Sequence, residues 1–188
     1  MQALLGGLTV LTGLNPFTVM AHFLLSIVLV GISVKIFDYF RFKSAPNKLP
    51  KIISTYLSLL TIVGFIVIVL GTITTGSGPH SGDDLAARFN IDMRVIAWLH
   101  ADTVLLFVGL VIGLFIITFV NRKASYLNPN AKILLIICVF QGLLGYIQWF
   151  NSLPWILVSI HVLGSVVTWI ALVFVALNSS NLLLKRLK

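Results

Sequence analysis

Five long apolar stretches run through this chain of 188 residues and constrain what it can fold into. A helix that spans a bilayer needs about 20 such residues at 1.5 Å per residue. Lipid offers the backbone no hydrogen-bond partners, so each stretch must satisfy its own polar groups as a helix. Strands of a membrane β-barrel would alternate apolar and polar residues, and these stretches do not. The predicted spans are residues 17–37, 52–73, 95–120, 131–150 and 154–178.

The composition agrees with an all-α polytopic membrane protein. Hydrophobic residues make up 59% of the chain and charged residues 10%, whereas soluble domains carry about 25% charged residues. The net charge of +8 does not indicate nucleic-acid binding, because the basic residues lie between the apolar spans. Basic residues collect in the cytoplasmic loops of membrane proteins. We therefore expect the chain to contact membrane lipid and no nucleic acid.

The charges between the spans predict an orientation. Segments 35–51, 122–132 and 185–188 hold 11 of the 13 basic residues. Segment 74–93 holds three Asp, and the 151–153 turn is uncharged. By the positive-inside rule the C-terminus is cytoplasmic, and the segments 74–93 and 151–153 face outward.

Part of the chain repeats, without a gap, at an interval of 139 residues. Matches of Leu and Val arise easily in apolar sequence, but this register also aligns a His with a His, and the chain has only four His. An internal repeat decides the architecture of a chain. The matched pairs include Gln2 with Gln141, Gly6 with Gly145, His22 with His161 and Ser26 with Ser165.

The repeat predicts the domain organisation. Residues 52–178 form one complete four-helix transmembrane bundle. Residues 1–40 match only the last one and a half helices of such a bundle, so we expect them to be the remnant of a preceding homologous bundle. Residues 41–51 are then a cytoplasmic linker, and residues 179–188 are a basic cytoplasmic tail.

Three histidines lie inside predicted spans, where an ionisable residue indicates a functional site. His22, His100 and His161 each follow the outer end of a span by five to seven residues, which is about 8–10 Å of helix. Two His at matched depth on facing helices can ligate one haem iron from both sides. The alternative is that each His hydrogen-bonds a neighbouring helix. We expect His100 and His161 to share one haem, and His22 to have the same role in the other copy.

Other polar residues near the outer ends of the spans have two possible interpretations each. His80 and Asp83 lie in the glycine-rich segment 75–83, which is either a structural loop over the bundle or the border of a cofactor or proton path. Asp102 is either an interfacial carboxylate paired with Arg94 or a neighbour, or a group that supports a haem or relays protons.

Small and neutral residues near the histidines suggest close helix packing. Gln2 and Gln141 are expected to hydrogen-bond across helices. The single cysteine, Cys138, lies in an apolar span and is expected to be an inert, buried thiol. No arrangement typical of a nucleophilic or zinc site occurs, so chemistry here would need a cofactor. The glycines expected to admit a close helix or a flat macrocycle are Gly142, Gly145 and Gly164.

Several short motifs resemble one family in combination. GTITTGSGPH at 71–80 is followed by Gly82 and Asp83, and LHAD occurs at 99–102. QGLLGY lies at 141–146, HVLG at 161–164, LTGLNP at 11–16 and AHF at 21–23. These motifs resemble haem A synthase, in particular its actinobacterial form, and the resemblance covers essentially the whole chain.

The resemblance implies a fold and an activity. Haem A synthases are eight-helix membrane enzymes of two four-helix repeats. They oxidise a ring methyl group of haem O to a formyl group and so supply haem A to cytochrome oxidase. Their C-terminal half holds haem b, and so its iron, between two His that match His100 and His161. Their N-terminal half holds haem O between another pair, of which His22 matches the second member.

The resemblance also implies surroundings and partners. It places the chain in a bacterial plasma membrane as a multi-pass protein. Haem O is the implied substrate, and haem O synthase, oxidase assembly proteins and a second copy of the chain are candidate partners. The electron donor is not identified. Candidates for groups that support the haem are Asp102, His80, Asp83 and Gln141.

The chain departs from the family in its N-terminal half. The first His of the N-terminal pair has no counterpart, and neither does the catalytic glutamate, since the chain contains no Glu. The outer loop that carries a cysteine pair in many members is also absent. We therefore expect an N-terminally truncated chain that needs the missing half for activity, and the sequence assigns no catalytic residue.

Two other functions fit part of the pattern. The intact four-helix unit alone could be a membrane cytochrome b that transfers electrons. A transporter or assembly protein would use the His for purposes other than haem ligation, but no cluster of charges at the middle of the spans supports a transporter. The repeated Gln and His favour the two-halved enzyme.

Overall fold

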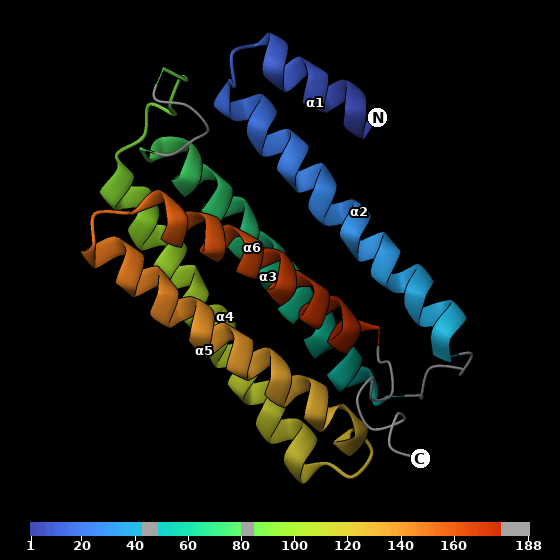
Figure 1. Cartoon of the computed structure of the whole chain (residues 1–188). Helices are drawn as coiled ribbons and strands as arrows, with labels where there is room; N and C mark the ends of the chain where they lie inside the picture. The colour runs from blue at the N-terminus through green and yellow to red at the C-terminus, as the bar shows by residue number, and fades with distance from the viewer. Residues whose placement is uncertain (43–48, 80–84, 178–188) are drawn as a thin grey trace.

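The computed structural model describes residues 1–42, 49–79 and 85–177, and every regular element over these residues is a helix (Figure 1). The chain is thus an all-α polytopic membrane protein. Its helices are α1 (Gln2–Leu11), α2 (Pro16–Phe42), α3 (Lys51–Ser77), α4 (Met93–Val120), the short 3-10 helix η1 (Ser125–Leu127), α5 (Asn128–Phe150) and α6 (Trp155–Ala176).

The five helices α2 to α6 have the length and apolar composition needed to cross a membrane, which confirms the five predicted spans. Helix α1 has only 10 residues and is too short to cross alone. It folds back against α2, as Figure 1 shows in blue.

Two helices run further than the apolar pattern predicted. Helix α2 continues to Phe42, because a helix does not have to end where the lipid ends. Helix α3 continues through segment 74–77, which the sequence assigned to the outer loop. The hydroxyls of Thr74, Thr75 and Ser77 donate hydrogen bonds of 2.8–3.0 Å to carbonyls one turn earlier, so these polar residues fit a helix.

Helices α3 to α6 form a closed ring of contacts: α3 with α4, α4 with α5, α5 with α6, and α6 with α3. Helix α2 packs outside this ring against α6 and α3. The side chain of Trp169 on α6 fixes this contact, because its Nε1–H donates a 2.9 Å hydrogen bond to the Ile27 carbonyl on α2.

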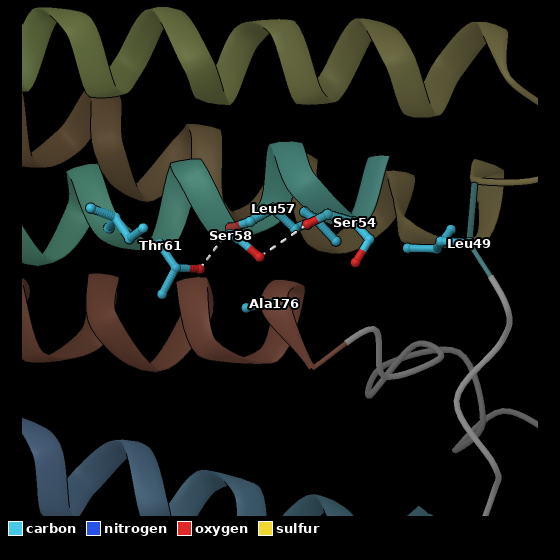
Figure 2. A pocket seen from close by; sticks show the side chains of 7 residues that line it. Leu49, Ser54, Leu57, Ser58, Thr61 and Ala176 are labelled. Atoms are coloured by element: carbon cyan, nitrogen blue, oxygen red, sulfur yellow. Dashed lines mark hydrogen bonds between the residues drawn. The ribbon is translucent and has the colours of Figure 1, made fainter. Parts of the chain in front are cut away.

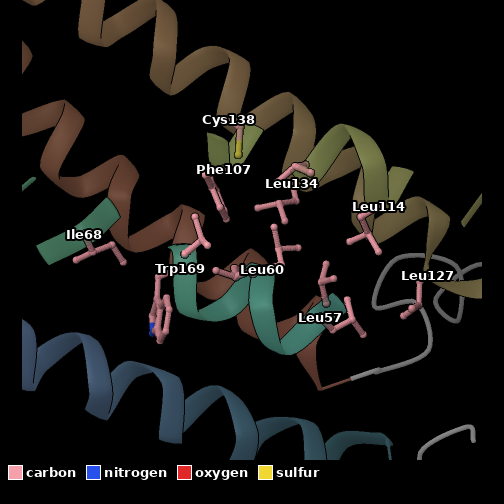
Figure 3. Packing of buried hydrophobic residues seen from close by; sticks show 14 of the residues in the cluster. Leu57, Leu60, Ile68, Phe107, Leu114, Leu127, Leu134, Cys138 and Trp169 are labelled. Atoms are coloured by element: carbon pink, nitrogen blue, oxygen red, sulfur yellow. The ribbon is translucent and has the colours of Figure 1, made fainter. Parts of the chain in front are cut away.

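The packed core lies mainly in the half of the bundle away from the predicted outer ends. Figure 3 shows a cluster of buried side chains running from Leu57 and Leu127 to Ile68, Phe107, Cys138 and Trp169. Cys138 is a buried free thiol, as predicted. Two members, Ile27 and Ile68, lie past the midpoints of α2 and α3 toward the outer ends. Near the outer ends themselves, Ile96 and Leu144 are buried outside this cluster.

The hairpins α1–α2 and α5–α6 have the same turn. Leu14 and Leu153, which match in the repeat, have positive φ values of 58° and 56°. The backbone N–H of Leu14 donates to the Thr9 carbonyl, and that of Leu153 donates to the Gln148 carbonyl in the equivalent position. The sequence repeat is therefore a repeat of three-dimensional structure.

Candidate functional site

Three histidines occupy one end of the helices, which we call the His end: the starts of α2, α4 and α6. His22 follows the first residue of α2 by six residues, His100 follows that of α4 by seven, and His161 follows that of α6 by six. These intervals correspond to about 9–11 Å of helix. The matched depth predicted from the sequence is thus present.

His100 and His161 lie on diagonally opposite helices of the ring. Helices α4 and α6 each pack on α3 and α5, and they make no comparable contact with one another among the described residues. Two side chains on diagonal helices at equal depth can address one ligand between them.

Each of the three imidazoles packs against a glycine on the neighbouring helix. If the glycine were replaced by alanine, its new Cβ would lie close to Cε1 of the histidine ring. A distance of 3.4–4 Å between these two atoms would be an ordinary van der Waals contact. The pairs and the distances from the added Cβ to Cε1 are Gly6 with His22 at 3.0 Å, Gly71 with His100 at 3.2 Å and Gly145 with His161 at 3.6 Å.

The two ring nitrogens of each histidine differ. The Nδ1 atoms of His22, His100 and His161 are shielded from solvent and make no hydrogen bond of ordinary geometry. The Val67 carbonyl, one turn before Gly71, approaches the His100 ring. The Nε2 atoms are not shielded from solvent to the same degree and make no hydrogen bond to the described residues. In each ring Nε2 is therefore the nitrogen free to bind a ligand.

Glutamines fix the main chain of the two repeated histidines. Gln141 Nε2 donates a 3.0 Å hydrogen bond to the His161 carbonyl, and Gln2 Nε2 donates one of 3.1 Å to the His22 carbonyl. Gln2 also hydrogen-bonds Ser26 Oγ. These bonds confirm the predicted cross-helix role of both glutamines.

The glycines singled out in the sequence have different neighbours. Gly145 faces His161, as described above. A Cβ on Gly164 would overlap the Gln141 carboxamide, so this glycine admits the side chain that holds α6. Gly142 has nothing within 4 Å of an added Cβ. Gly145 and Gly164 thus make room for side chains of the neighbouring helix.

The remaining candidates do not join the histidines. Asp102 is exposed on α4 and makes no hydrogen bond or ion pair, with Arg94 or otherwise, in the described part of the chain. His80 and Asp83 lie outside the described residues. Asp92 has a role that the sequence reasoning missed: its carboxylate caps the start of α4 and accepts bonds of 2.8 and 3.0 Å from the N–H groups of Arg94 and Val95.

The contacts between glycines and histidine rings were not predicted from the sequence, although the repeat contains part of the information. Gly6 and Gly145 precede their histidines by the same interval within the repeat. Gly71 has no such sequence signal, because only the packing of α3 on α4 brings it to His100.

A pocket of about 440 Å³ lies at the other end of α3 and is lined by hydroxyls and apolar side chains (Figure 2). Ser58 and Thr61 donate hydrogen bonds to the carbonyls of Ser54 and Leu57, one turn back in the same helix. Their donors are therefore already used. This pocket lies away from the His end and contributes nothing to the histidine site.

The donor set suits a haem held by two axial ligands. No group of three or more His, Cys, Asp or Glu side chains in the described residues is arranged for a metal ion. A haem iron needs only two axial ligands from the protein, and imidazole is a common one. The Nε2 atoms of His100 and His161, which make no hydrogen bond to the described residues, fit this requirement.

Comparisons with known proteins add no identification: no protein-family model, curated protein or solved structure matches the chain. The function is therefore argued from the site itself.

Proposed function

We propose that the chain serves haem A biosynthesis, the oxidation of the haem O ring methyl to a formyl group, with a haem b held by His100 and His161. The observation that carries the proposal is the pair of histidines on diagonal helices, at matched depth near the starts of α4 and α6. The family resemblance leads us to place the chain in a bacterial plasma membrane, and the distribution of basic residues supports a cytoplasmic C-terminus.

The residues of the bundle have distinct tasks in this proposal. The Nε2 atoms of His100 and His161 would hold the iron, while Gln141 holds the main chain of α6 at His161. Helices packed around the pair would limit access of water. A bound haem b would supply one-electron redox chemistry. Oxidation of the methyl to a formyl group removes electrons and adds an oxygen atom, so it would also need a final electron acceptor and an oxygen source such as dioxygen or water.

His22 would serve the substrate. Its ring lies against Gly6 and its carbonyl accepts from Gln2, in the same way as His161 with Gly145 and Gln141. This likeness supports haem binding at the α1–α2 hairpin. Since the described part of this hairpin presents one His, we propose that a further helix, from a preceding segment or a second polypeptide, completes the substrate site.

A membrane cytochrome b that only transfers electrons is the second candidate. One observation favours it: helices α3 to α6 bring two histidines together, whereas α1 and α2 bring only His22. The two functions differ in whether haem O binds at His22.

Haem retention tests the proposal. The chain is produced in cells that make haem O and purified, and its extracted haems are separated by chromatography. We expect both haem b and haem O in the unaltered protein, because His22 alone can supply one axial ligand to the haem O iron and the further helix is needed for its oxidation. His22→Ala should lose haem O and keep haem b, because the haem b ligands lie on other helices.

The control is Ser33→Ala, an exposed residue of α2 whose hydroxyl bonds only its own helix. It should retain both haems. Haem b without haem O in the unaltered protein would favour the electron-transfer function. Haem O that persists in His22→Ala would remove His22 from the substrate site. Haem A should appear only when the completing helix is supplied.

A further inference from the structure

The surroundings of His100 and His161 differ in one respect. The Cβ of an alanine at position 71 would lie 3.2 Å from the His100 Cε1, closer than an ordinary contact. At position 145 the same atom would lie 3.6 Å from the His161 Cε1, within the ordinary range. The ring of His100 therefore has no spare room on the side of α3, and the ring of His161 does.

The His100 ring packs closely against α3. Its Nδ1 makes no hydrogen bond of ordinary geometry. The ring instead rests on the bare backbone of α3 at Gly71, beside the Val67 carbonyl. The glycine allows this approach because it has no side chain.

We propose that Gly71 is a positioning residue: by packing on the His100 imidazole it sets the ring orientation, and so the electronic state of the haem that this ring ligates. The inference rests on the proposed haem site. Orientation and surroundings of the axial ligands tune the redox potential of a haem iron. A displacement of the ring by a few tenths of an ångström should therefore be visible in the spectrum and the potential.

Alanine substitutions test the role of Gly71 on the proposed haem, with a control at Gly145, beside the second axial ligand His161. Gly71→Ala should shift the low-spin electron paramagnetic resonance signal and the midpoint potential. Gly145→Ala should leave both unchanged, because its Cβ has room. Gly109→Ala on α4, with nothing within 4 Å of its Cβ, gives the baseline. Alanine has a higher helix propensity than glycine, so a loss of helix stability would not explain a shift in the signal or the potential.

A free ligand separates positioning from a general structural effect. In His100→Gly, added imidazole can occupy the ligand position without a tether to α4. An untethered ring can move away from a new Cβ, so Gly71→Ala should cause no shift in this background.

The outcomes are distinct. The proposal is overturned if the Gly71→Ala signal coincides with those of Gly145→Ala and Gly109→Ala, or if the shift persists with free imidazole. It is also overturned if Gly71→Ala loses its helical circular dichroism, since the contact requires only a small movement of one ring. Absence of any low-spin haem in the unaltered protein would instead contradict the proposed function.

Discussion

At the scale of single residues, each repeated histidine has a glycine beside its ring and a glutamine that hydrogen-bonds its main-chain carbonyl. For His161 these are Gly145 and Gln141, and for His22 they are Gly6 and Gln2. Hydrogen bonds between side chains inside a membrane contribute about 0.6 kcal/mol on average and up to about 1.7 kcal/mol. Each glutamine bond therefore has a measurable but modest effect on stability.

Gln141→Met tests this contribution. Methionine keeps the length of the side chain but cannot donate to the His161 carbonyl. We expect the free energy of unfolding to fall by about 0.6–1.7 kcal/mol and haem binding to weaken. Unfolding in mixed micelles, followed by circular dichroism, measures the first effect, and haem titration measures the second.

Gln148→Met on the same helix is the matched control. Gln148 Oε1 is buried and accepts no hydrogen bond, so its removal should be neutral or stabilising. If Gln148→Met lowered the free energy of unfolding as much as Gln141→Met, the role assigned to Gln141 would be contradicted.

The sequence predicted part of this arrangement. Gln141 and Gln2 recur with their histidines, so a cross-helix hydrogen bond could be expected from the repeat. The contact of Gly71 with His100 could not, because it depends on how α3 and α4 are aligned along their lengths. That alignment is set by side-chain packing, which the hydropathy pattern does not encode.

At the scale of elements, the hairpin α1–α2 attaches to the bundle through α2. The hydrogen bond from Trp169 to the Ile27 carbonyl is buried, and the Trp169 ring also lies against Gly31 and Phe65. This contact links the hairpin that carries His22 to the bundle that carries the other two histidines.

Trp169→Phe should weaken that link. Phenylalanine keeps an aromatic ring but cannot donate to Ile27, and a lost hydrogen bond of this kind costs about 1 kcal/mol. For a chain of this size that corresponds to a fall in the thermal midpoint of about 2–4 °C. Thermal unfolding measures it. Trp98→Phe, at a position 62% exposed, should change the midpoint little, and an equal fall in both variants would argue against the link.

The helices themselves were the most predictable elements. A long apolar stretch in lipid has no alternative to a helix, so all five spans were found. Their ends were less predictable, because residues such as Thr74 and Ser77 can satisfy their hydroxyls within a helix as well as in a loop. The left-handed conformation of Leu14 and Leu153 was not predictable, since leucine rarely adopts it.

At the scale of the whole molecule, the ring of four helices divides into two halves. Most of the packed apolar cluster lies away from the His end. The proposed ligand site thus lies in a different part of the same helices from most of this cluster. The sequence predicted the four-helix unit and the depth of its histidines, but not that α4 and α6 are diagonal, which follows from the order of contacts around the ring.

The central claim is that His100 and His161 hold one haem between them. The most direct measurement is the absorption spectrum of the purified protein. It should show a six-coordinate, low-spin haem that is lost in His100→Ala and in His161→Ala and is retained in His22→Ala. Loss of that haem in His22→Ala, with its retention in His161→Ala, would contradict the account.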